Sequence, residues 1–215
     1  MVQWSTITFL FLSPPKASSP PLPFNHSAFL IFIAVNNCKA AYDATVHLIN
    51  EGYKKIACLA NAEHLSITEE RIKGYKQALQ KNNMAVDETL IKICEHGGLV
   101  LEETEKAVDE LMHLNPMPDA IVGLNDKLTT GCLKILQLKK IKIPGDIALV
   151  GFTNSDLSEL LNPSLTIIRQ PAFEMGELAT GLLIQQIESK RLTREFSKKI
   201  LETELVVRDS SRRTI

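Results

Sequence analysis

The 215-residue chain contains none of the short motifs that mark common enzyme and metal sites. Its four cysteines stand far apart at positions 38, 58, 94 and 132, so neither a zinc ligand set nor a dithiol redox site is indicated. Its five histidines include no i, i+4 pair of the kind that binds metal on a helix. The nucleotide-binding glycine motifs and the G-x-S-x-G hydrolase motif are also absent. We therefore expect no catalytic residue, no metal and no cofactor.

The chain also lacks an excess of either charge sign and has no long apolar run. The formal net charge is −1, whereas nucleic-acid interfaces usually show a clustered basic surface. The two apolar runs near the N-terminus, Ile7–Leu12 and Ala28–Val35, are far shorter than the about 20 residues that a helix needs to span a bilayer. The sequence predicts neither direct nucleic-acid binding nor a membrane protein.

The first 34 residues differ from the rest in composition. Half of the chain's ten prolines lie there, at positions 14, 15, 20, 21 and 23, together with several serines. Such a composition is typical of linkers, so we expect residues 1–34 to be a disordered leader and the folded domain to begin near Val35. An export signal is the alternative. A signal peptide requires a positively charged residue before its apolar stretch, and no Lys or Arg precedes this one.

From Val35 onward, helical and strand patterns alternate. Strands are predicted at Ile56–Ala60, Leu90–Cys94, Ala120–Leu124 and Ile147–Phe152, with amphipathic helices between them. Gly52 is expected to end the first helix, and Ser66-Ile67-Thr68-Glu69 fits a capping box at the start of the second. Repeated βα units of this length predict an α/β fold with a parallel sheet flanked by helices.

Polar residues follow two of these predicted strands. Gly151–Leu157 comes directly after the apolar run Ile147–Val150, and Asn125-Asp126 comes after Ala120–Leu124. In open α/β sheets, ligands collect at the carboxyl ends of the strands. These two segments therefore predict a small-molecule pocket.

The strand-end segments belong to a series of blocks that resembles the LacI/GalR family of bacterial transcription regulators. Six blocks occur in the family's order between Val35 and Ser211: His47–Ala57, Thr68–Tyr75, Pro118–Asp126, Ile143–Phe152, Asn162–Pro171 and Glu204–Ser210. The resemblance implies a periplasmic-binding-protein-like effector domain over residues 35–215, with one lobe complete and the second partial. The C-terminal lobe would span about 53–165, returning pieces of the other lobe about 169–190, and a final strand about 199–207.

In this family a small molecule, often a sugar or nucleobase, binds between the lobes and alters DNA affinity. By position, Arg71 corresponds to the arginine whose planar donors fork onto the ligand. The alternative is a salt bridge on the helix surface, to Glu69 or Glu70. Asn125 and Asp126 would hydrogen-bond the ligand, although a helix N-cap is an equally good role for them.

The remaining ligand residues implied by the resemblance come later in the chain. Thr153 stands where many family members carry an aspartate, which removes a carboxylate acceptor for a sugar diol or an amine, and Asn154 could substitute as a neutral acceptor and donor. Gln170 would supply a polar contact and Phe173 a stacking ring, with core packing as the alternative for Phe173.

The resemblance also implies partners. We expect a cytoplasmic homodimer that binds DNA only through a helix-turn-helix, and no such segment is visible before Val35. The expected function is therefore effector sensing without DNA binding by these residues alone. A secreted or periplasmic sugar-binding protein and an enzyme on an α/β scaffold are the alternatives. The segment Phe173–Ile187 would expose apolar surface, because part of its lobe is not apparent in the sequence.

Overall fold

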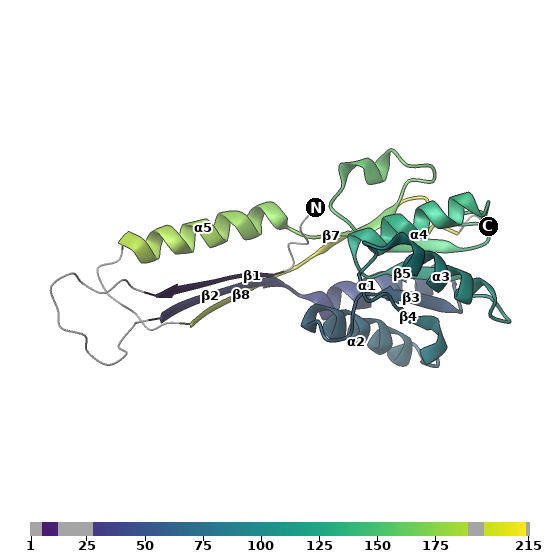
Figure 1. The fold of residues 1–215 in the computed structure, drawn as a ribbon, viewed down its shortest axis with the longest axis horizontal. Helices are drawn as coiled ribbons and strands as arrows, with labels where there is room; N and C mark the ends of the chain where they lie inside the picture. Colours follow the sequence, from purple (N-terminus) through teal and green to yellow (C-terminus); the bar gives the residue numbers. More distant parts are fainter. Residues whose placement is uncertain (1–5, 13–27, 189–195, 214–215) are drawn as a thin grey trace. The chain divides into compact units, whose positions relative to one another are not determined.

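A computed structural model describes residues 6–12, 28–188 and 196–213 (Figure 1). The chain divides into two compact units. The large unit contains residues 36–170 and 203–215, and the small unit contains residues 2–35 and 171–202. No helix in the described part of the chain has the length and apolar character needed to cross a membrane.

The large unit is built on a six-stranded sheet with the order β4-β3-β5-β6-β7-β9. All neighbouring strands are parallel except β9, which runs antiparallel to β7. The strands are β3 Ile56–Ala60, β4 Ile91–Ile93, β5 Ala120–Gly123, β6 Ala148–Phe152, β7 Thr166–Arg169 and β9 Glu204–Val206.

Four α-helices cover this sheet, two on each face. They are α1 Asn37–Asn50, α2 Ser66–Lys81, α3 Leu101–Met112 and α4 Asp126–Leu138. Alternate strand residues point to opposite faces, so Cys58 and Val122 pack with α1 and α2, whereas Leu59 and Ile121 pack with α3 and α4. Two short 3₁₀ helices, η1 Glu88–Leu90 and η2 Asp156–Glu159, complete the unit. The predicted α/β fold with a helix-flanked parallel sheet is confirmed.

Local signals at the helix ends are only partly realised. Gly52 has a φ of 92° and directly follows the C-cap of α1, as predicted, and its N–H donates to Ile49 O at 3.0 Å. The capping box predicted for α2 does not form. Ser66 is already the first helical residue, and the N-cap Leu65 has no side-chain oxygen to bind the free N–H groups.

Helices α1 and α2 pack unusually closely at Gly74. A Cβ atom at this position would lie 2.0 Å from the carbonyl oxygen of Cys38 on α1. Only a residue without a side chain allows the two backbones to approach this far, so Gly74 sets the distance between the helices. This packing places the first turn of α1 beside the first half of α2, where the candidate site begins.

The small unit contains a three-stranded sheet, β1-β2-β8, and one described helix. Strand β2 Ala28–Val35 pairs antiparallel with β1 Thr6–Leu12 and parallel with β8 Phe196–Leu201, and helix α5 Ala172–Glu188 packs beside them (Figure 1). Its core consists of Ile33, Val35, Met175 and Ala179.

Two expectations for this region differ from the structure. Residues 6–12 and 28–35 are strands rather than disordered leader, because the two apolar runs pair with each other; residues 1–5 and 13–27 lie outside the described residues. The final strand expected at 199–207 is two strands, β8 and β9, which belong to different sheets. The chain passes from the small unit to the large one at residues 202–203, which interrupts the strand pairing.

Candidate functional site

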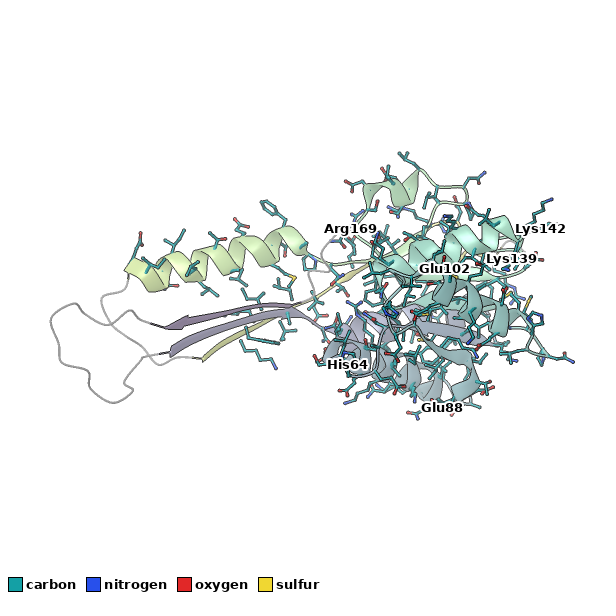
Figure 2. The ribbon with its side chains drawn as sticks, viewed as in Figure 1. His64, Glu88, Glu102, Lys139, Lys142 and Arg169 are labelled. Carbon is teal, nitrogen blue, oxygen red and sulfur yellow. The ribbon has the colours of Figure 1, made fainter. Side chains whose placement is uncertain are left out.

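The candidate site lies where β5, β6 and β7 end. Because these strands are parallel, their carboxyl ends share one edge of the sheet. Asn125 follows β5, Thr153 and Asn154 follow β6, and Gln170 follows Arg169, the last residue of β7, which is labelled in Figure 2. Helix α2 contributes Arg71.

Arg71 is at the centre of a buried polar network. Its side chain is 1% exposed, and its Nε donates to Asn37 Oδ1 at 3.0 Å. Its Nη1 donates to the carbonyl of Leu124, and its Nη2 lies 3.5 Å from Gln170 Oε1. The guanidinium carbon lies 3.9 Å from the ring centroid of Phe152, within cation–π range. The structure thus brings Arg71 and Gln170 together, as the predicted site requires.

The alternative interpretation of Arg71 as a surface salt bridge is wrong. Among the described residues no carboxylate lies within ion-pair distance of its guanidinium, and Glu70 instead accepts a hydrogen bond from Asn37 Nδ2 at 3.0 Å. Burial lowers the pKa of Arg71 to about 9, while the charge of Glu70 opposes this shift. Arg71 therefore stays protonated at neutral pH and offers a charged donor inside the domain.

Asn125 caps helix α4. Its Oδ1 accepts from the N–H of Leu128 at 2.8 Å, and its Nδ2 donates to the carbonyl of Gly97 at 3.1 Å. The N-cap role is therefore present, and it fixes the glycine loop after β4 against the start of α4. The neighbouring Asp126 has a buried Oδ1 for which the described residues supply no hydrogen-bond donor. Of this pair, Asp126 has the acceptor that a ligand could use.

The side chains after β6 are held by the backbone. Asn154 Nδ2 donates to Gln170 O at 2.7 Å, and Gln170 N–H donates to Asn154 Oδ1 at 2.8 Å. Thr153 is buried, and its Oγ1 accepts from the N–H of Ser155 at 3.0 Å. These bonds connect the ends of β6 and β7, so the side chain of Gln170 extends from a fixed backbone toward Arg71.

Phe173 is the predicted site residue that belongs to the small unit. It lies in the first turn of α5, in the small unit, and is 84% exposed. Core packing, the alternative considered for it, does not occur. Its stacking role stays a prediction.

Two residues of the network were not predicted from the sequence as site residues. Asn37 is the first residue of α1, 34 positions before Arg71, and Phe152 was assigned to a strand without a role toward Arg71. A buried asparagine at a helix start is a weak signal, because N-terminal caps use the same residue type. No group of three potential metal ligands occurs within the described ranges.

The site can be compared with known proteins. The sequence profile of the periplasmic binding protein-like domain matches residues 45–211. The chain belongs to this family. Its curated relatives are LacI-type regulators: the HTH-type transcriptional repressor CytR of Escherichia coli strain K12 is 32% identical over 180 residues, which are 84% of this chain and 51% of the repressor. The chain thus spans about half the length of the curated relatives that it matches.

Solved structures give the same assignment for this periplasmic binding protein-like chain. The transcriptional regulator CelR in complex with cellobiose matches with a TM-score of 0.74 and 30% identity, over 83% of this chain and 53% of that one. A LacI family regulator from Enterococcus faecium with bound ribose has a TM-score of 0.74 and 26% identity, over 83% and 64% of the two chains. These relatives are transcriptional regulators rather than enzymes.

Proposed function

We propose that this domain senses a small-molecule effector for a LacI-type transcription regulator. The observation that carries the proposal is the charged Arg71 guanidinium, buried at the carboxyl edge of a parallel sheet and held without a carboxylate partner among the described residues. A buried charge is costly to desolvate, so a fold that keeps one at a ligand-binding edge gains if a ligand bonds to it.

The proposed ligand is a sugar or a nucleobase-like compound. Arg71 would donate to a carbonyl or hydroxyl oxygen, and the unpaired Oδ1 of Asp126 would accept from a hydroxyl or amine. Gln170 would present its amide beside Arg71, while Asn125, Thr153 and Asn154 shape this edge of the site. Phe173 would stack on the ligand from α5. The proposed role needs no cofactor, no metal and no catalytic group.

Thermal-shift and calorimetric titrations with ribose, cellobiose, cytidine and adenine test this proposal. A ligand that binds the folded protein raises its melting temperature. Arg71→Gln should weaken the binding compound about 10- to 100-fold, since hydrogen bonds to a charged group are lost. Arg71→Lys should rescue little, because an ammonium lacks the planar fork.

Arg169→Gln is the matched control, because Arg169 is half-exposed at the neighbouring strand end and lies 4.0 Å from Glu204. Circular dichroism establishes that each variant is folded. Equal affinity of the wild type and folded Arg71→Gln, or no response of the wild type to any of the four compounds, would contradict effector sensing at this site.

We also propose a homodimer formed through the large unit. Three leucines, Leu138, Leu157 and Leu160, are 71%, 64% and 76% exposed. The two segments that carry them are linked, since Gln137 at the end of α4 donates to Asn162 O, just beyond η2, at 3.2 Å. Exposed Lys134 on α4 and exposed Asp156 on η2 give these segments both charge signs, so α4 of one copy could pair with η2 of another.

Sedimentation of Leu157→Asp tests the homodimer. The wild type should sediment as a dimer and the variant as a monomer, while Leu99→Asp, at a leucine that is 78% exposed elsewhere, should stay dimeric. A monomeric wild type at high micromolar concentration would overturn this part of the proposal. As a transcription regulator's domain the protein would act in the cytoplasm, and DNA contact would come from a helix-turn-helix.

A further inference from the structure

Asn37 lies between a surface carboxylate and the buried guanidinium. Its side chain belongs to the first residue of α1 and is 3% exposed. Its Oδ1 accepts from Arg71 Nε at 3.0 Å, and its Nδ2 donates to Glu70 Oε2 at 3.0 Å. Arg71 and Glu70 are neighbours on α2, and one amide bridges their side chains, between which the described structure has no ion pair.

We propose that Asn37 is a positioning residue that sets the orientation of Arg71 toward the effector. This inference rests on the proposed function, since it concerns the same site. Without neighbours that select one orientation, an asparagine amide can adopt either of its two flipped orientations, because its oxygen and nitrogen have similar size. Glu70 can only accept a hydrogen bond, so it selects the orientation that directs Nδ2 toward itself and Oδ1 toward Arg71.

The orientation matters because it determines which donors of Arg71 are left for a ligand. A guanidinium has five N–H donors, and those on Nε, Nη1 and Nη2 engage Asn37, Leu124 and Gln170 once each. With these contacts made by the described residues, one N–H on each terminal nitrogen remains for a ligand. The Phe152 ring lies against the face of the guanidinium and restricts its tilting. Loss of the Asn37 contact would therefore leave the guanidinium free to rotate within its own plane.

The arrangement also limits the cost of burial. Glu70 is exposed and keeps its own hydration, while its charge partly offsets the lowering of the Arg71 pKa by burial. A direct Glu–Arg pair would occupy two guanidinium donors with a bidentate contact. Asn37 occupies one, and so leaves the charge and the remaining donors available.

Two variants of Asn37 separate positioning from simple packing. Asn37→Leu keeps the branched skeleton of the side chain and removes both the acceptor and the donor. It should weaken binding of whichever of ribose, cellobiose, cytidine or adenine the wild type binds by about tenfold. Asn37→Asp keeps an acceptor for Nε, but its carboxylate can also engage a second guanidinium donor, so it should recover only part of that loss. Asn82→Leu is the control, because Asn82 lies at the far end of α2 from the site and its side chain makes one hydrogen bond, to Ala78 O at 2.8 Å.

A second measurement does not depend on any ligand. The Arg71 Nε–H should give a slowly exchanging resonance in a ¹H–¹⁵N spectrum, identified by its loss in Arg71→Lys. It should persist in Asn37→Asp and Asn82→Leu and exchange rapidly in Asn37→Leu. A persistent resonance in Asn37→Leu, or unchanged ligand affinity in that variant, overturns the positioning role. If the wild type binds none of the four compounds, the proposed function fails, and the resonance alone still decides whether Asn37 orients Arg71.

Discussion

The two units of this chain bury their sheets to different extents. In the large unit, apolar side chains on both faces of the six-stranded sheet are covered by paired helices, α1 with α2 and α3 with α4. In the small unit, the described residues supply one helix, and the core is formed by four side chains. Apolar residues such as Phe173 and Ile187 remain 84% and 73% exposed there.

This difference shows why the polar network belongs to the large unit. A sheet covered on both faces leaves its strand ends as the place where polar side chains can gather. Its dense packing also fixes each donor and acceptor, so a buried guanidinium can be held by single hydrogen bonds. The small unit's one-sided core offers less restraint. We therefore expect mutations to cost more in the large unit than in the small one.

The largest effect is expected from Gly74→Ala in the large unit. The added methyl group would overlap the backbone of α1 at Cys38, which cannot move aside like a flexible side chain. We expect the free energy of unfolding to fall by about 3 kcal/mol, the upper end for overpacking. Urea denaturation measures this change. Gly176→Ala on α5 is the control, because no atom lies within 4 Å of the added carbon; a similar loss there would contradict the comparison.

A smaller effect is expected in the small unit from Met175→Ala. Met175 is fully buried against Ile33 and Val35, and its truncation should cost about 2 kcal/mol, the lower end for such changes, since a one-sided core can relax around the cavity. The loss of stability should appear as faster hydrogen exchange of the amides in α5 and β2. Phe173→Ala is the matched control and should change stability little. Equal losses of protection in the large unit would show that the two units unfold together.

The smallest effect is expected in the pH dependence of stability, through His47 in the large unit. His47 Nε2 lies 2.7 Å from Ser211 Oγ, and burial lowers the pKa of His47 below 6.5, with Glu51 opposing this shift and Arg212 adding to it. The unfolded chain therefore binds a proton more readily than the folded one, so stability falls as pH falls through 6.5 toward the folded-state pKa. His47→Gln should flatten this part of the stability profile. An unchanged slope in the variant would assign the dependence to other groups.

Part of the fold and of the candidate site could be predicted from the sequence. The alternation of apolar runs and amphipathic segments predicted the α/β class and the positions of β3, β5 and β6, because a strand buried on both faces must be apolar throughout. The family blocks pointed to Arg71, Asn125 and Gln170 without showing their contacts. The capping box at Ser66 failed, since the helix began one residue earlier than the motif required.

By itself, the sequence determined the type and order of the α-helices and strands from α1 to α5, because those depend on local periodicity and on turn residues such as Gly52. Only the tertiary structure decided which polar side chains meet. Asn37 and Arg71 are 34 residues apart, and Arg71 and Gln170 are 99 apart, so their contact depends on strand register and on the close α1–α2 packing at Gly74. Likewise, the expected strand at 199–207 became β8 and β9 because strand pairing is set by non-local partners.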